Sequence, residues 1–136
     1  MRLDHVGVNV ADLAAAETWY SQAFYLQREL EVRIDALDLD IVMLISEEFG
    51  YRVELLHRRG CGPGLRAENP AVAALTEGFG HIAFDVPDLD SAHVRLVSMA
   101  AREVMPPQPS PEPGVRMSFL ADPEGNLIEL VERHPS

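Results

Sequence analysis

The sequence repeats itself once, and this internal repeat constrains the fold more than any other feature. Residues 5–16 align with residues 81–92 at a constant offset of 76, and each of these segments begins with a histidine. Further along, residues 53–56 match residues 128–131 at an offset of 75, with a glutamate second in each. Such spacing is typical of a duplicated supersecondary unit. The chain is therefore interpreted as two copies of one module.

The first copy has the pattern of a βαβββ module. Apolar and polar residues alternate at the start of the chain, which is the period of a strand with two different faces. Asp12 is a good N-cap for the helical pattern that follows, and alternation returns after the helix. The expected elements are a strand at 2–10, a helix from Asp12 to about Tyr25, and strands at 28–37, 41–45 and 51–57.

The second copy predicts the same order of elements after a glycine-rich linker. Asn69 and Pro70 begin a short helix in the linker, and Asp88 caps the longer helix of the second module. The expected elements of the second module are strands at 79–86, 102–105, 115–121 and 127–133 and a helix from 88 to about 101. The predicted organisation is one structural domain with a first module at 1–58, a linker at 59–78 and a second module at 79–136.

A proline-rich segment interrupts the second module. Residues 106–113 hold prolines at 106, 107, 109, 111 and 113. Because proline donates no backbone hydrogen bond, this segment is expected to follow an extended, unpaired path, as a loop or a lid, rather than to lie inside a sheet.

The charge balance argues against several kinds of partner. A net charge of -11 and a pI of about 4.7 repel phosphate backbones and anionic lipids, so neither nucleic acid nor a membrane surface is an expected partner. The sequence contains no lysine, which excludes Schiff-base chemistry. No segment resembles a signal peptide or approaches the length of a membrane span. A cytoplasmic protein is therefore expected.

The repeated histidines and glutamates carry the predicted chemistry. If the apolar face of each strand packs under a helix, these polar side chains face the other side of the sheet, in a cleft. An unpaired buried carboxylate is costly, so each glutamate is expected to have water, a cation or a metal nearby. Two imidazoles and two carboxylates suit Zn, Ni, Co, Mn or Fe, with positions left open for other ligands. The predicted metal ligands are His5, Glu54, His81 and Glu129. His57, His93 and His134 are expected at the surface, outside the site.

Three segments, at 5–13, 80–89 and 122–130, resemble hallmarks of the vicinal oxygen chelate superfamily. That superfamily includes glyoxalase I, methylmalonyl-CoA epimerase, extradiol dioxygenases and the fosfomycin- and bleomycin-resistance proteins. The resemblance implies an α+β fold in which two βαβββ modules form a cupped mixed sheet with an open metal-binding cleft. It also implies that the ligands come from the first and last strands of each module, which selects the same four residues.

The resemblance further implies a lyase or isomerase of glyoxalase I or acyl-CoA epimerase type. Such an enzyme chelates two neighbouring oxygens of a small-molecule substrate and transfers a proton through an enolate. With lysine absent and both histidines bound to metal, Glu129 or Glu54 is the expected base. The alternatives are an Fe(II) extradiol-type dioxygenase that uses His5, His81 and Glu129, and a non-catalytic resistance protein that sequesters a drug. A homodimer is also expected, with the site formed within one chain or between two.

One part of the epimerase pattern is absent. Residues 53–57 and the segment from Pro70 to His81 are similar to methylmalonyl-CoA epimerases. The resemblance leads us to expect a second catalytic carboxylate on the third strand of the first module. Asp38 and Asp40 precede the matching region, which is apolar in this chain.

Overall fold

The computed structural model describes residues 1–135 and contains two βαβββ modules. The chain divides into two compact units, Met1–Gly62 and a second unit that begins at Pro63. Each unit holds one four-stranded sheet, in which one strand pair is parallel and the other pairs are antiparallel. The predicted α+β class, with two βαβββ modules and mixed sheets, is confirmed.

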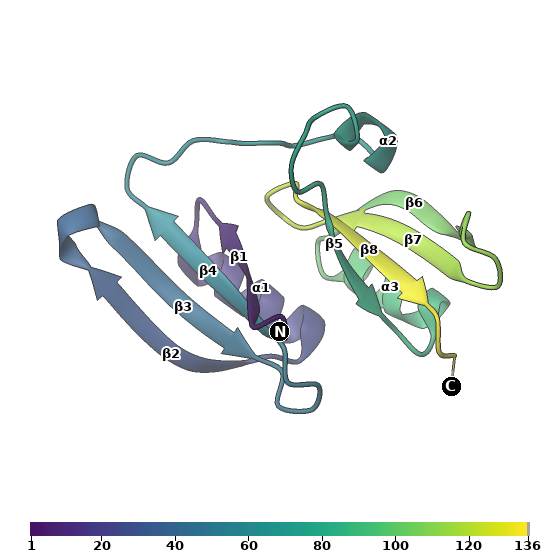
Figure 1. Ribbon diagram of the computed structural model, residues 1–136, viewed down its shortest axis with the longest axis horizontal. Helices are drawn as coiled ribbons and strands as arrows, with labels where there is room; N and C mark the ends of the chain where they lie inside the picture. The colour runs from purple at the N-terminus through teal and green to yellow at the C-terminus, as the bar shows by residue number, and fades with distance from the viewer. Residues whose placement is uncertain (136) are drawn as a thin grey trace. The chain divides into compact units, whose positions relative to one another are not determined.

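In the first unit, α1 lies across one face of a sheet with the strand order β1-β4-β3-β2 (Figure 1). The Asp12 carboxylate caps α1 by accepting a hydrogen bond from the backbone N–H of Ala15, and Tyr25, with a φ of 54°, ends the helix. The elements of this unit are β1 (His5–Asn9), α1 (Leu13–Phe24), β2 (Gln27–Ile34), the 3₁₀ turn η1 (Asp35–Leu37), β3 (Leu39–Ile45) and β4 (Arg52–Arg58).

The core of the first unit lies between α1 and one face of this sheet. Val42 and Leu44 on β3 and Val53 and Leu55 on β4 are fully buried, and Trp19 and Tyr20 of α1 are buried with them. Because side chains alternate along a strand, the residues between these positions must face away from α1. Glu54 is one of them.

The expected strand at 28–37 is too long. β2 ends at Ile34, and Asp35–Leu37 forms the single turn η1, which Asp38 ends with a φ of 51°. The turn is stabilised by Arg33, whose guanidinium contacts the carboxylates of Asp35, Asp38 and Asp40. The apparent alternation up to residue 37 therefore spans a strand and the turn that follows it.

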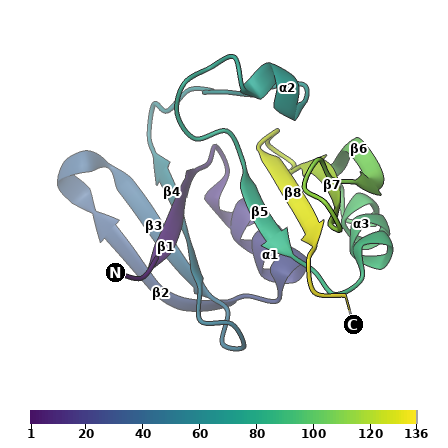
Figure 2. The same cartoon turned by 45° about the vertical axis from the view of Figure 1, so that its right-hand side comes forward.

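In the second unit, α3 covers one face of a sheet with the order β5-β8-β7-β6 (Figure 2). Leu96 on α3 and Leu120, Ile128 and Leu130 on the sheet are fully buried. The elements are α2 (Pro70–Ala73), β5 (Ile82–Asp85), α3 (Leu89–Ser98), β6 (Arg102–Pro109), β7 (Arg116–Ala121) and β8 (Leu127–Glu132). None of the helices within residues 1–135 is both long enough and apolar enough to cross a membrane.

The proline-rich segment was expected to be unpaired, and for residues 106–109 this expectation is wrong. These residues form the end of β6, which pairs with β7 through Gln108 opposite Met117 and Pro109 opposite Arg116. Two shifts in register interrupt the ladder around Met105. β6 is an edge strand, where a residue that lacks an N–H is tolerated.

The turn between β7 and β8 is organised by one buried carboxylate. Asp122 is 4% exposed and accepts hydrogen bonds from the backbone N–H groups of Glu124 and Asn126 and from the Asn126 side chain. Gly125 takes a φ of 94°, which favours glycine. These contacts give the Asp-Pro-Glu-Gly-Asn sequence a structural role, because they fix where β8 begins.

We predict that the stability of the first unit depends on pH through Glu17. Its carboxylate on α1 forms a two-point ion pair with Arg28 on β2, at 2.6 Å in both contacts, and these hydrogen bonds lower the pKa of Glu17 below its ordinary value of 4.5. A lowered native pKa stabilises the fold above the unfolded pKa, and this contribution is lost as the pH falls through the native pKa. We expect Glu17→Gln to lower the free energy of unfolding at pH 7 by less than about 1 kcal/mol, because Arg28 is half-exposed.

Urea unfolding of the wild type and Glu17→Gln at pH 7 and at several values below 4.5 tests this prediction. The difference between the two proteins should shrink as the pH falls. Glu48→Gln, which changes an exposed carboxylate in the turn before β4, is the matched control and should show no such difference. A difference that stayed constant at all pH values would contradict the prediction.

Candidate functional site

The first unit brings His5 and Glu54 together on the sheet face opposite α1. The parallel pairing of β1 with β4 places Gly7 directly opposite Glu54, and His5 lies two residues earlier on the same face. His5 Nε2 is 3.7 Å from Glu54 Oε1. A Cβ atom at Gly7 would lie 3.5 Å from Glu54 Oε1, so a small residue is accommodated beside the pair.

The second unit brings His81 and Glu129 together in the same way. Ala83 on β5 is opposite Glu129 on β8, and His81 lies two residues before Ala83. His81 Nε2 is 3.1 Å from Glu129 Oε2. The His81 ring also meets Phe119 on β7 edge to face, with 5.1 Å between the ring centres. Each unit therefore presents one histidine–glutamate pair next to a small residue.

Neither glutamate is cut off from water. The side chains of Glu54 and Glu129 are 22% and 17% exposed to solvent, and those of His5 and His81 are more exposed. Burial alone therefore does not require a cation beside either carboxylate, contrary to the argument made from the sequence. Within residues 1–135, the structure shows no group of three or more His, Cys, Asp or Glu side chains arranged to hold a metal ion.

The donor atoms nevertheless suit a shared cation. Two ligands bound to one divalent ion of the zinc class, each at about 2.1 Å, lie about 3.0 to 3.4 Å apart. The separation of 3.1 Å between His81 and Glu129 falls in this range, and the 3.7 Å between His5 and Glu54 is slightly longer. Imidazole nitrogen and carboxylate oxygen are donors that Zn, Ni, Co, Mn and Fe all accept. The donor atoms of both pairs, and the spacing within the His81–Glu129 pair, therefore fit such an ion.

Beyond Arg52, the sheet face beside Glu54 is apolar on β3 and on the facing part of β2. Met43 on β3 is directly opposite Glu54, and Ile41 is opposite Leu56. On the edge strand β2, Leu30 and Val32 continue this face as the neighbours of Met43 and Ile41, and each is 42% exposed. The glutamate is thus bordered by aliphatic side chains that solvent can reach.

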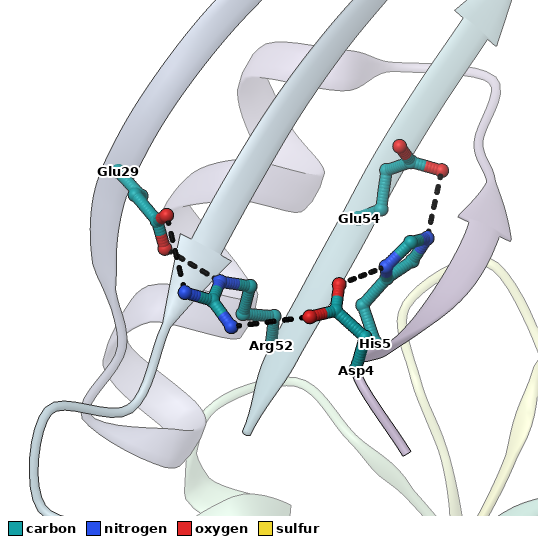
Figure 3. A network of polar contacts seen from close by, with 5 residues as sticks. All are labelled: Asp4, His5, Glu29, Arg52 and Glu54. Carbon is teal, nitrogen blue, oxygen red and sulfur yellow. Dashed lines mark hydrogen bonds and ion pairs between the residues drawn. The ribbon is translucent and has the colours of Figure 1, made fainter. Parts of the chain in front are cut away.

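A polar network behind His5 could not be deduced from the repeat (Figure 3). Asp4 Oδ2 accepts a hydrogen bond from His5 Nδ1 at 2.7 Å, and this hydrogen bond lowers the pKa of Asp4. Arg52 contacts Asp4 at 3.5 Å and Glu29 at 2.8 Å. The only sequence signal was an aspartate immediately before the repeated histidine, since Arg52 and Glu29 are distant in the chain.

His93 is buried, so the expectation that it lies at the surface is wrong. Its side chain is 3% exposed, with Nδ1 2.9 Å from the Ser118 hydroxyl and Nε2 2.7 Å from Glu103. Ser118 is also fully buried, on the face of β7 that α3 covers. The group therefore joins α3, β6 and β7 inside the second unit and does not belong to the exposed pair at His81.

Comparison with known proteins identifies the family to which these modules belong. The profile of the Glyoxalase/Bleomycin resistance protein/Dioxygenase superfamily matches residues 2–130, which is nearly the whole chain. The chain belongs to this superfamily. The membership agrees with the resemblance seen in the sequence motifs.

A curated relative and several solved structures support this placement in the glyoxalase superfamily. The chain is 32% identical over 135 residues to an ethylmalonyl-CoA/methylmalonyl-CoA epimerase of Cereibacter sphaeroides, covering 95% of this chain and 96% of the relative. A glyoxalase family protein from Enterococcus faecalis superimposes with a TM-score of 0.79 at 20% identity, covering 96% of this chain and 97% of that one. Maize glyoxalase I gives a TM-score of 0.77 at 21% identity, covering 99% of this chain and 46% of the maize chain. The two structures show the fold that this superfamily member shares with them.

We predict that His93 contributes to stability, unlike the exposed histidine of the C-terminal segment. His93→Ala removes a buried ring and leaves the buried Ser118 hydroxyl without this partner, so the free energy of unfolding should fall by about 2 to 3 kcal/mol. His134→Ala is the matched control, because His134 is exposed and contacts Asp85 at the surface. It should change stability by less than about 0.5 kcal/mol. Urea unfolding measures both, and equal effects of the two substitutions would contradict the prediction.

Proposed function

We propose that the protein is a divalent-metal-dependent isomerase that epimerises a carbon atom next to a thioester carbonyl in an acyl-CoA. The observation that carries this proposal is the histidine–glutamate pair, which recurs at equivalent strand positions in both units. The similarity to an ethylmalonyl-CoA/methylmalonyl-CoA epimerase over nearly the whole chain supports the choice of reaction. We infer that the substrates are CoA thioesters of 2-alkylmalonic acids.

The proposed ligands of the cation are His5, Glu54, His81 and Glu129. Both imidazoles present Nε2 towards a carboxylate; the 3.1 Å within the second pair fits two ligands of one ion, and the 3.7 Å within the first pair is slightly longer. Neighbouring carbonyl and carboxylate oxygens of a malonyl thioester form the kind of bidentate group that suits the remaining coordination positions. When bound, the cation supplies a Lewis acid that stabilises the negative charge of the substrate enolate.

The two glutamates are the proposed proton carriers. Epimerisation requires one group to remove the proton from one side of the carbon atom and a group on the other side to return a proton. Glu54 and Glu129 occupy equivalent positions in the two copies of the module, which gives the chain two carboxylates for these two roles. No lysine is available, and Met43, opposite Glu54 on β3, is no base. The epimerase pattern places a second catalytic carboxylate on this strand, and in our proposal the two glutamates take over its role.

The aliphatic face beside Glu54 suits the alkyl branch of such a substrate. Met43 lies opposite Glu54, Ile41 and Leu56 continue the same face on β3 and β4, and Val32 extends it on β2. Burial of an alkyl group against these side chains would contribute about 0.8 kcal/mol per methylene group. Exclusion of water from the carboxylate would also favour removal of a weakly acidic C–H proton.

The predicted homodimer and cytoplasmic location remain predictions.

We predict that the protein purifies with about one divalent ion per chain and that each unit is needed to keep it. His5→Ala changes only the first unit and His81→Ala changes only the second, yet each should abolish near-stoichiometric binding if all four donors share one ion. Mass spectrometry of metal content, after purification without chelator or nickel resin, measures this. His134→Ala, which removes an exposed histidine, is the control and should keep the metal.

Two other results would change the proposal in defined ways. Two ions per chain, with each substitution removing one, would show that the pairs bind metal separately and would contradict the shared site. No bound metal in the wild type, even after divalent ions are added, would contradict a metal-dependent enzyme and would favour a ligand-sequestering protein.

We predict that the metal-loaded protein exchanges the α-proton of a 2-alkylmalonyl-CoA with solvent. In D₂O, a single epimer should become a mixture that carries deuterium at the α-carbon, as followed by circular dichroism and mass spectrometry. Glu54→Gln and Glu129→Gln should each lower kcat by about 10²- to 10⁴-fold, because each removes a proton-transfer group. Glu48→Gln, in an exposed turn, should leave kcat unchanged.

Metal content is measured on the same samples, so that loss of a base is distinguished from loss of the ion. A wild-type protein that binds metal but exchanges no α-proton would contradict the epimerase. If that protein instead cleaved a catechol with Fe(II) and oxygen, the dioxygenase alternative would replace it.

A further inference from the structure

The hydrogen bond between Asp4 and His5 determines which imidazole nitrogen faces Glu54. A carboxylate can only accept hydrogen bonds, so the 2.7 Å contact with Asp4 requires the proton of a neutral His5 to be on Nδ1. Nε2 then carries the lone pair, and it is this atom that lies 3.7 Å from Glu54 Oε1. The contact thus selects the tautomer in which the nitrogen nearest the glutamate is free to bind a cation.

Asp4 is itself held by an anchor on the sheet. Arg52 lies on β4, on the same face as Glu54 and two residues before it, and contacts Asp4 Oδ1 at 3.5 Å. Two hydrogen bonds, at 2.8 and 3.3 Å, tie the Arg52 guanidinium to Glu29 on β2. The order Glu29, Arg52, Asp4, His5, Glu54 therefore forms one chain of contacts that links β2, β4 and the start of β1 (Figure 3).

At the equivalent positions, the described part of the second copy has no such anchor. The offset of 76 places Gly80 where the first copy has Asp4, and the offset of 75 places Leu127 where it has Arg52. Neither residue has a polar side chain. His81 instead packs edge to face against Phe119, which occupies the place that Met43 has opposite the first glutamate. The two histidines are thus oriented by different means although their backbone positions are equivalent.

We propose that Asp4 is a positioning residue, which fixes the tautomer and direction of His5 so that Nε2 is presented to the divalent cation. This inference rests on the proposed function for the identity of that cation. A carboxylate that accepts the second N–H of a metal-binding histidine typically contributes 10- to 100-fold to metal affinity. The first histidine therefore depends on a polar network and the second on aromatic packing.

Asp4→Ala tests the proposal, because the Asp4 side chain is mostly exposed and its removal leaves no cavity. Asp35→Ala is the matched control, since it also removes an exposed carboxylate that pairs with an arginine of the first unit but touches no histidine. Long-range ¹H–¹⁵N NMR of the metal-free proteins at a pH where imidazole is neutral reports the tautomer of His5. Competition with a fluorescent chelator for Zn²⁺ reports the affinity of each protein.

We expect wild type and Asp35→Ala to show the Nδ1–H tautomer and the same Zn²⁺ affinity. Asp4→Ala should populate the Nε2–H tautomer and bind Zn²⁺ about 10- to 100-fold more weakly. An Asp4→Ala protein with the wild-type tautomer and affinity would overturn the role of Asp4 and leave the proposed function intact. A wild type that binds no Zn²⁺ would overturn the proposed function and, with it, the role of Asp4 towards a cation.

Discussion

The parallel pairing of the first and last strands in each module is the constraint on which the candidate site depends. In β1–β4 and in β5–β8, this register places a small residue opposite the glutamate and the histidine two positions before it. The alternation of side chains then sends the leucine, valine and isoleucine neighbours of each glutamate under a helix. One arrangement of strands therefore buries the core and exposes a nitrogen–oxygen pair on the opposite face. A slip of a single residue in β4 would exchange these two faces.

Much of this arrangement could be predicted from the sequence. The alternation of apolar and polar residues in a strand and the repetition of a motif can both be recognised without knowledge of the fold. The alternation around Glu54 and Glu129 identified the strands, and the recurrence of the histidine and glutamate motifs at offsets of 76 and 75 identified the modules. Asp12 and Asp88 cap the helices as their spacing predicted. The sequence pattern did not indicate the order of the strands within each sheet. Residues 106–109 were assigned to an unpaired loop because nothing local reveals that β6 lies at an edge, where proline is tolerated.

The residues that the sequence did not reveal are those whose partners are remote in the chain. His93 is buried because Ser118 and Glu103 satisfy both ring nitrogens, and neither is a helical neighbour of the histidine. Asp4 adjoins His5, but its anchor Arg52 is 48 residues away. Duplication also concealed the difference between the copies, since backbone positions repeat more faithfully than the polar groups around them. Equivalent residues in a duplicated fold therefore need not share the same supporting contacts.

The prolines of β6 also affect where the second sheet ends. A strand at the edge of a sheet normally offers a row of free N–H and C=O groups on which a further strand can form. Pro106, Pro107 and Pro109 contribute no N–H, and the register shifts around Met105 break the even spacing that a new strand would require. Growth of the sheet beyond β6, by a segment of this chain or of another, is thereby discouraged. The prolines of β6 therefore also make it unfavourable for the protein to associate through the exposed backbone of this edge.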